Sequence, residues 1–175
     1  MSDFFGEGWS EFTFRVFVAA SRQTVFQHWA TSGGLEKWFF EEAEYLDAEG
    51  AVRESDAHVQ AGDGCRWKWH GWDHTHEGTI TEVGADEFME FTFPPAGTVR
   101  IQFVDRGAER TEVVLTQSGI PHSSDKEIKD FYYGCSLGWS FWLVNLKAFL
   151  EHGIVLNELD HPYTDQKTIC QLVNH

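Results

Sequence analysis

The clearest pattern in the sequence is the run from Asp125 to His152, DKEIKDFYYGCSLGWSFWLVNLKAFLEH. Apolar residues recur in it at alternating steps of three and four, which is the spacing of one face of an α-helix. They are Ile128, Phe131, Cys135, Trp139, Trp142, Leu146 and Phe149. Ser124 or Asp125 is placed to cap the start of this helix, and Gly153 to end it. The sequence therefore predicts one long helix whose apolar face must be covered by another element.

Two glycines, Gly134 and Gly138, lie inside this predicted helix. Each costs about 1 kcal/mol relative to alanine, because glycine loses more backbone freedom on entering a helix. We expect close packing of the helix backbone onto a sheet to offset this cost.

The chain before this helix alternates polar and apolar residues in short runs, which predicts β-strands. The expected strands are residues 11–19, 39–46, 65–69, 76–83, 88–93, 98–105 and 110–117, with a short edge strand around 57–60. After the first strand, Ser21 is placed to cap a helix over 22–30, Ser32-Gly33-Gly34 breaks it, and residues 35–38 form another helical turn. Short connections between the later strands predict an antiparallel meander.

The predicted fold class is therefore α+β. A curved antiparallel sheet of about six to seven strands wraps around the long C-terminal helix, with two short helices after the first strand. A strongly curved sheet gripping a helix leaves a natural place for a cavity between them.

The composition is that of a folded, acidic protein. Of its 175 residues, 42% are hydrophobic, and 13 basic against 28 acidic residues give a net charge of −15. Such a charge repels phosphate backbones, so we expect no nucleic-acid partner. Cys65, Cys135 and Cys170 are widely spaced, which is typical of a reducing compartment. Residues 1–10 are unlike a signal peptide, and no run approaches the roughly 18 apolar residues of a membrane span, so we expect a cytoplasmic protein without membrane insertion.

Three stretches, in this order, resemble a known family. They are Ala20–Phe26 with Trp29 and Leu35–Trp38, then Gly62–Trp69 with Gly78–Val83, and finally Gly138–Gly153. They resemble the START-like (SRPBCC, helix-grip) superfamily, and within it the bacterial relatives of the activator of the heat-shock protein 90 ATPase. The resemblance covers residues 11–153. It implies one helix-grip domain over 1–153 and leaves 154–175 as a tail or a short extra helix.

Aromatic residues make up 15% of the chain, and many fall on the predicted inner face of the sheet or of the helix. A closely filled core explains them as well as a pocket does, but the resemblance favours a pocket for a small apolar molecule or a lipid. The predicted lining residues are Trp67, Trp69, Phe91, Phe93, Ile101, Phe103, Val113, Leu115, Phe131, Tyr132, Cys135, Trp139, Trp142 and Leu146. Tyr132, His70 or Arg66 would supply polar groups at its mouth.

Other functions stay open from the sequence. The resemblance implies a co-chaperone-like interaction module with a chaperone as partner, although a shared fold does not carry an interface across. A cyclase or dehydratase would need a general base, for which His70 and His122 are the first candidates. Exposed edge strands and the tail could pair two copies into a homodimer.

One histidine cluster suits zinc by residue type. His70, Asp73, His74 and His76 lie within seven residues, and imidazole and carboxylate groups are zinc ligands. A polar hairpin loop explains the same residues. Because tight zinc sites need three or four well-placed ligands, we expect no metal and no cofactor.

Overall fold

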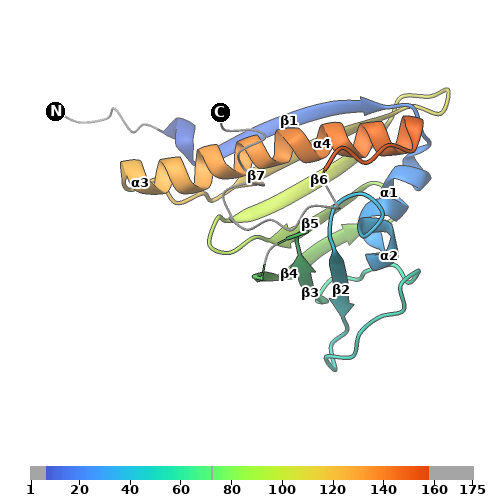
Figure 1. The fold of residues 1–175 in the computed structure, drawn as a ribbon, viewed down its shortest axis with the longest axis horizontal. Helices are drawn as coiled ribbons and strands as arrows, with labels where there is room; N and C mark the ends of the chain where they lie inside the picture. Colours follow the sequence, from blue (N-terminus) through green and yellow to red (C-terminus); the bar gives the residue numbers. More distant parts are fainter. Residues whose placement is uncertain (1–6, 72, 158–175) are drawn as a thin grey trace.

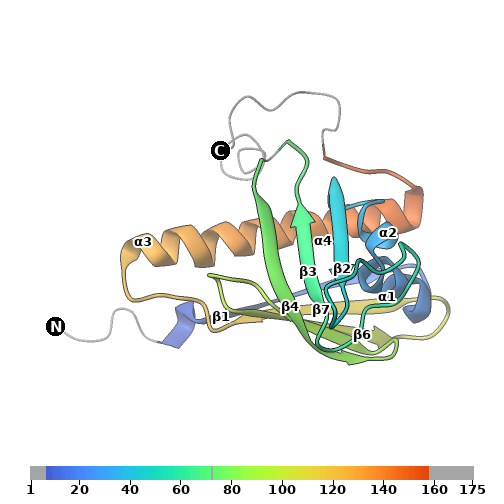
Figure 2. The same ribbon diagram turned by 90° about the horizontal axis from the view of Figure 1, so that it is seen from below.

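The computed structural model describes residues 7–71 and 73–157. The chain forms one seven-stranded antiparallel sheet in the order β1-β7-β6-β5-β4-β3-β2 (Figure 1). The strands are β1 (Glu11–Val18), β2 (Glu42–Leu46), β3 (Gly64–Lys68), β4 (Thr75–Gly84), β5 (Phe88–Thr92), β6 (Thr98–Asp105) and β7 (Thr111–Ser118). The helical segments are η1 (Glu7–Trp9), α1 (Arg22–Ala30), α2 (Ser32–Leu35), α3 (Asp125–Glu127), η2 (Ile128–Tyr133) and α4 (Gly134–His152). Figure 2 shows the sheet bending, with the long helix in the bend, so the predicted α+β helix-grip fold is confirmed.

The meander places apolar residues on one face by simple alternation. In the β6–β7 pair, Ile101 lies opposite Leu115 and Phe103 opposite Val113. All four side chains are buried. Successive strand residues point to opposite faces, so this register turns one apolar row toward the helix. The inward face predicted for these two strands is confirmed.

The C-terminal helix is continuous from Asp125 to His152 but changes its winding on the way. Ser124 caps its start by accepting a hydrogen bond from the Glu127 N–H at 3.2 Å, and Gly153 ends it in the left-handed conformation at φ 68°. Both predicted ends are confirmed. The first turns include the π-helical segment η2, whose wider winding lets the adjacent residues Phe131 and Tyr132 both pack against the core.

Two expectations for the first half of the chain are wrong. Ser32-Gly33-Gly34 does not separate the short helices but begins α2, because the Thr31 hydroxyl accepts from the Gly34 N–H at 3.0 Å. Residues 57–60 form no strand. Instead, the Val59 N–H donates to the Ala30 carbonyl at 2.8 Å, which docks this segment on the end of α1. In both cases a contact between neighbouring segments overrides the local pattern.

The explanation expected for Gly134 and Gly138 is also wrong. A Cβ atom built on Gly138 meets no atom within 4 Å, and one on Gly134 would only reach the Lys129 carbonyl of its own helix at 4.0 Å. The sheet therefore does not approach the helix backbone at either position, and packing within the described chain gives no reason for glycine there.

We expect Gly138→Ala to raise the free energy of unfolding by about 0.5–1 kcal/mol, because alanine has the better helix propensity and the space is open. Gly153→Ala is the control. It should lower stability by about 1 kcal/mol, since that position requires a positive φ. Urea unfolding followed by circular dichroism measures both. A destabilising Gly138→Ala would mean that something packs against this face.

The sheet ends in edge strands β1 and β2, and side chains occupy some of their outer backbone groups. On β1, the Phe17 carbonyl accepts from Lys147 Nζ, and directly after the strand the Ala19 N–H donates to Glu151 Oε1, each at 2.7 Å. On β2, the Ala43 N–H donates to Glu36 Oε1 at 3.0 Å. Pairing of a second copy at these points would have to break these bonds.

The first residues after the long helix are held by Asn145. Its Oδ1 accepts from the Leu156 N–H at 2.7 Å, and its Nδ2 lies 3.3 Å from Asn157 Oδ1. The rest of the expected tail, from residue 158, lies outside the described residues, as does Cys170. None of the described helices is both long and apolar enough to cross a membrane.

Candidate ligand-binding site

The fourteen residues predicted to line a pocket all belong to the apolar layer between sheet and helix. Nine are buried in the core: Trp67, Phe91, Ile101, Phe103, Val113, Leu115, Trp139, Trp142 and Leu146. Five are partly buried and pack against that core: Trp69, Phe93, Phe131, Tyr132 and Cys135. The structure therefore brings the predicted residues to one layer of the fold. Whether they form a packed core or a binding site depends on how closely the side chains fill this layer.

Toward α2, this layer is filled by three consecutive aromatic residues that are absent from the predicted pocket lining. Trp38, Phe39 and Phe40 are each 1% exposed. Phe39 stacks on Phe40 with ring centroids 3.8 Å apart, and Phe40 stacks on Trp67 at 5.2 Å. Phe39 also lies 4.6 Å from Trp142 on the helix. At this end the expected pocket is a packed core. The uninterrupted Trp-Phe-Phe run was the available signal, since a half-buried strand would alternate.

Directly beside this packed run lies a histidine among aromatic rings, some of which contact Phe39 and Phe40. We name the His76 cluster after its members Trp67, Trp69, His76, Phe93 and Trp139. His76 lies 4.4 Å from Phe93, 5.8 Å from Trp67 and 6.0 Å from Trp69, between ring centroids. Phe93 in turn lies 5.7 Å from Trp139 on α4. Trp69 and Phe93 are half-buried, so the cluster reaches from the core to the surface.

Strand alternation explains why His76 points inward. In the β3–β4 pair it lies directly opposite Trp67, and Ile80, four residues along β4, is fully buried on the same face. His76 itself is only 6% exposed. By residue type His76 was a candidate zinc ligand, whereas the structure makes it part of the aromatic layer.

Burial is the main cause of an unusual acidity at His76. Loss of water and, to a smaller extent, nearby His74 together lower its pKa to about 4, although a hydrogen bond with the Thr92 backbone acts in the opposite direction. The ring is therefore neutral at pH 7. In the neutral ring, one nitrogen carries the proton that faces the Thr92 carbonyl, so the other nitrogen, Nε2, is a hydrogen-bond acceptor. Nε2 is buried without a hydrogen-bond partner.

This acidity predicts a loss of stability on mild acidification. The pKa of His76 is lower in the folded chain than the ordinary value near 6.5, so the unfolded chain binds more protons between pH 6.5 and 4. The stability that the neutral ring contributes is fully present above pH 6.5 and decreases as the pH falls from 6.5 toward 4. We expect about 2 kcal/mol to be lost from pH 7 to pH 5 through His76. Burial also lowers the pKa of His28 and His70, which act in the same direction.

Urea unfolding at pH 7, 6 and 5 tests this expectation, with His76→Phe as the comparison. The variant should show a shallower dependence of the unfolding free energy on pH, because the remaining slope comes from His28 and His70. An unchanged slope in the variant would assign the effect to other groups.

The histidine cluster that suits zinc by residue type does not assemble into a site in the described residues. His74 and Asp73 are exposed while His76 points into the core. Within residues 7–71 and 73–157, no group of three or more His, Cys, Asp or Glu side chains lies close enough together to hold a metal ion.

The polar groups expected at the mouth lie elsewhere or play another part. Arg66 is on the outer face of the sheet, where it pairs with Glu44 at 2.5 Å, because it alternates with the inward Trp67. Its assignment to the mouth was wrong. Tyr132 packs edge-on against Phe12 and Trp9, at 5.5 and 5.0 Å, near the start of β1. His122, a candidate general base, lies after β7 with its Nδ1 2.8 Å from the Ile120 carbonyl oxygen.

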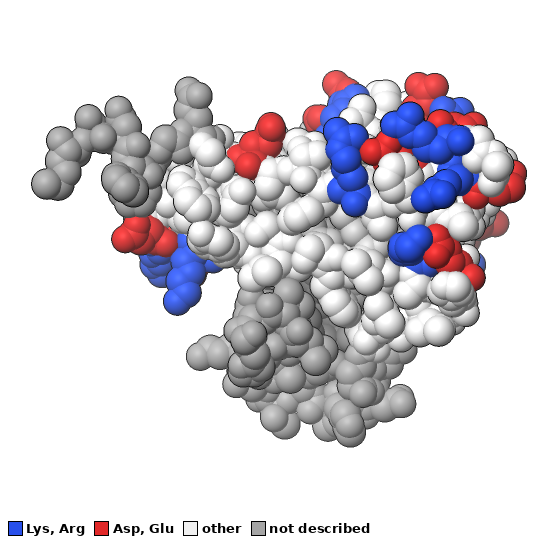
Figure 3. Space-filling model, turned by 90° about the horizontal axis from the view of Figure 1, so that it is seen from above, with Lys and Arg blue, Asp and Glu red and all other residues white. Residues whose placement is uncertain are grey.

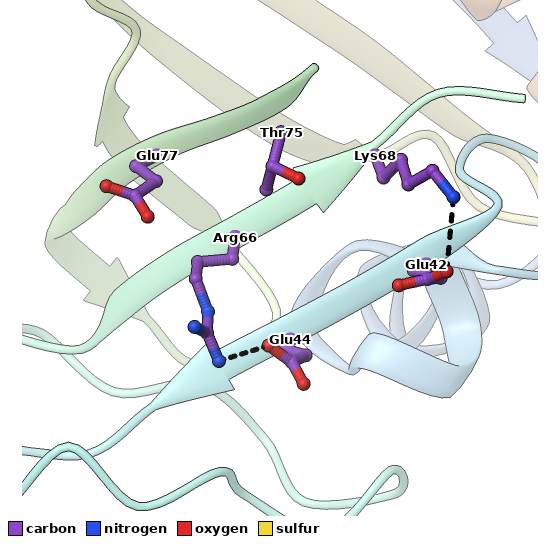
Figure 4. A pocket seen from close by; sticks show the side chains of 6 residues that line it. All are labelled: Glu42, Glu44, Arg66, Lys68, Thr75 and Glu77. Atoms are coloured by element: carbon purple, nitrogen blue, oxygen red, sulfur yellow. Dashed lines mark hydrogen bonds and ion pairs between the residues drawn. The ribbon is translucent and has the colours of Figure 1, made fainter. Parts of the chain in front are cut away.

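The outer face of the sheet has a hollow of its own, of about 350 Å³ (Figure 4). Its lining residues are Glu42, Glu44, Arg66, Lys68, Thr75 and Glu77. Both bases are already paired, Arg66 with Glu44 and Lys68 with Glu42 at 3.3 Å. Exposed pairs of this kind contribute little to stability, and they already engage both basic side chains of the hollow.

Ion pairs also cover other parts of this outer face. Arg100 reaches Glu82 at 3.0 Å and Glu90 at 3.1 Å, and the buried Glu112 pairs with Arg15 at 2.9 Å. Figure 3 shows basic and acidic side chains side by side at one end of the molecule. The basic side chains named on the outer face are therefore engaged in ion pairs, and the inner His76 cluster is the better candidate site.

Comparison with known proteins decides the family. The family model for Activator of Hsp90 ATPase homolog 1-like protein matches residues 19–151, which is most of the chain. The chain belongs to this family. The resemblance drawn from its three sequence stretches is thereby confirmed, and with it the START-like affiliation. No curated protein sequence matches the chain.

Solved structures of this family's type share the fold at low sequence identity. A protein from Staphylococcus saprophyticus has a TM-score of 0.66 and 21% identity, covering 84% of this chain and 96% of its own. The Aha1 dimer from Colwellia psychrerythraea has a TM-score of 0.63 and 18% identity, covering 82% and 97%. A conserved protein of unknown function from Enterococcus faecalis has a TM-score of 0.65 and 17% identity, covering 97% and 84%. At these identities the likeness concerns the fold alone, and membership supports a ligand-binding or Aha1-like domain in general terms.

Proposed function

We propose that the protein binds a small apolar or aromatic molecule at the His76 cluster, between the sheet and α4. The observation that carries this proposal is the pair of buried polar atoms in the cluster, His76 Nε2 and Trp67 Nε1, neither of which has a hydrogen-bond partner. Leaving such an atom unpaired costs about 1–3 kcal/mol, so folded proteins rarely keep one without a reason. A ligand that pairs with these atoms supplies the reason.

The surroundings of these atoms favour an apolar body for that ligand. Trp69 and Phe93 are half-buried and lie between the surface and the buried rings of Trp67 and Trp139. Covering half-exposed aromatic area gains about 25 cal/mol for each Å² removed from water. Binding sites are concave and mostly apolar with a few polar groups, and this cluster has that composition.

The first test is native mass spectrometry of freshly purified protein against the same sample denatured. A mass excess of a few hundred daltons that is lost on denaturation supports a bound organic molecule. The same native spectra report whether the protein is a monomer or, as in the Colwellia structure, a dimer.

The second test is titration with the neutral fluorescent probe N-phenyl-1-naphthylamine. Phe93→Ala should weaken binding about tenfold or more, because the aromatic contact is removed. Phe17→Ala is the matched control, since Phe17 is 43% exposed on the outer face of β1. The proposal is wrong if the wild-type protein shows no saturable binding, or if both variants weaken it equally.

A second proposal is a co-chaperone-like interaction, which the family description favours. A purified bacterial Hsp90 homologue, assayed for ATPase activity with and without this protein, tests it directly. Stimulation that survives Phe93→Ala would place that interaction away from the His76 cluster.

A further inference from the structure

The two unpartnered atoms of the His76 cluster differ in hydrogen-bonding character. The Trp67 indole nitrogen can only donate. The neutral His76 ring, with one nitrogen engaged by the Thr92 backbone, offers Nε2 as an acceptor. The two rings lie nearly parallel, at an interplanar angle of 20° with centroids 5.8 Å apart. A donor and an acceptor, both unsatisfied, therefore occupy neighbouring rings.

Three other buried atoms of the described chain lack a partner: Arg66 Nε on the outer face of the sheet, Asn157 Nδ2 after the long helix, and Trp29 Nε1 within the aromatic layer. Trp29 is 2% exposed and packs against Trp38 and Phe39, at 5.0 and 6.0 Å, in the filled part of the layer. Only the His76 cluster combines unpartnered atoms with the half-buried rings of Trp69 and Phe93 in the described chain.

The charges near the cluster do not favour an ionic ligand. Arg66 and Lys68 alternate with Trp67 along β3 and so lie on the outer face, where glutamates pair with them. Glu77 follows His76 on β4 and lines the same outer hollow. A charged group buried without a counter-ion is costly, so the aromatic interior selects for neutral molecules.

We propose that the ligand is a neutral hydroxyl-bearing aromatic molecule, whose hydroxyl group donates to His76 Nε2 and accepts from Trp67 Nε1. This inference rests on the proposed function and adds the functional group that the site recognises. A hydroxyl group satisfies both atoms because it is at once a donor and an acceptor. An ether only accepts, a hydrocarbon does neither, and a carboxylate brings a charge and no proton.

Four probes of similar shape separate these cases: naphthalene, 2-naphthol, 2-methoxynaphthalene and 2-naphthoate. Their affinities for the wild-type protein can be measured at pH 7 by quenching of tryptophan fluorescence. We expect 2-naphthol to bind at least tenfold more tightly than naphthalene or 2-methoxynaphthalene, because pairing an otherwise unsatisfied buried group is worth about 1–3 kcal/mol. The anionic 2-naphthoate should bind more weakly than 2-naphthol.

Variants assign the preference to the named atoms. His76→Phe should bring the ratio of 2-naphthol to naphthalene affinity close to one, since phenylalanine keeps the ring and removes the acceptor. Trp67→Phe should lower the ratio in part. His122→Phe is the control and should leave the ratio unchanged, because His122 lies in the connection after β7.

The outcomes distinguish this inference from the function on which it rests. If naphthalene and 2-naphthol bind equally well, the protein binds aromatic molecules without recognising a hydroxyl group, and the inference is wrong while the proposed function stands. A preference that persists in His76→Phe overturns the assignment to His76. If none of the four probes binds, the proposed function fails and the inference fails with it.

Discussion

Trp139→Ala is expected to lower the free energy of unfolding by about 4 kcal/mol, the largest effect of any substitution considered. The side chain is 3% exposed and lies between the helix and the sheet. Its ring packs against Phe39 and Phe93, each with centroids 5.7 Å away. Alanine would remove that packing and leave a cavity that the neighbouring aromatic rings can close only in part.

A hydrogen-bond chain adds to the effect at this position. Trp139 Nε1 donates to Gln117 Oε1 at 2.7 Å, and Gln117 Nε2 donates to the Ala96 carbonyl at 2.7 Å. Gln117 is fully buried, so its oxygen would have no substitute partner. Trp139→Phe keeps most of the ring and should cost about 1–3 kcal/mol, which isolates the hydrogen bond from the packing.

Urea unfolding followed by far-ultraviolet circular dichroism measures these losses without relying on tryptophan emission. Val144→Ala is the matched control on the same helix, because Val144 is 53% exposed and should cost well under 1 kcal/mol. Equal losses in Trp139→Ala and Val144→Ala would contradict the packing assigned to the helix.

Asn145→Leu is expected to cost about 3 kcal/mol, although leucine has a similar size and a better helix propensity. Asn145 is fully buried. Its Nδ2 donates to the Trp38 carbonyl, and its Oδ1 accepts from the Leu156 N–H at 2.7 Å. Leucine would leave both backbone groups without this partner. The expected loss of stability therefore comes from these two unpaired backbone groups and not from a change in side-chain size.

The same urea experiment tests this expectation against Asn157→Ala. Asn157 lies 3.3 Å from Asn145 at the end of the described chain, so its removal should cost less than about 1 kcal/mol. Neutral behaviour of Asn145→Leu would mean that the Trp38 carbonyl and the Leu156 N–H find other partners.

The candidate site was predictable in part. Alternation along β3, β5 and β6 correctly placed Trp67, Phe91 and Ile101 on the inner face, since a period of two is a local property of strands. The same rule applied to β4 would have turned His76 inward beside Trp67. The spacing of His70, Asp73, His74 and His76 instead suggested a zinc site in this part of the chain. The unpartnered state of His76 Nε2 depends on which side chains surround it, and no local pattern reports that.

Most of the strands and both ends of the long helix follow from local sequence patterns. The three-and-four spacing from Ile128 to Phe149, the cap at Ser124 and the left-handed Gly153 all depend on residues within a few positions of each other. That Phe39 and Phe40 pack against Trp67, Trp69 and Trp139 of the His76 cluster follows only from the three-dimensional arrangement. Those contacts join residues far apart in the chain, and their packing depends on side-chain shape, which hydrophobic periodicity does not encode.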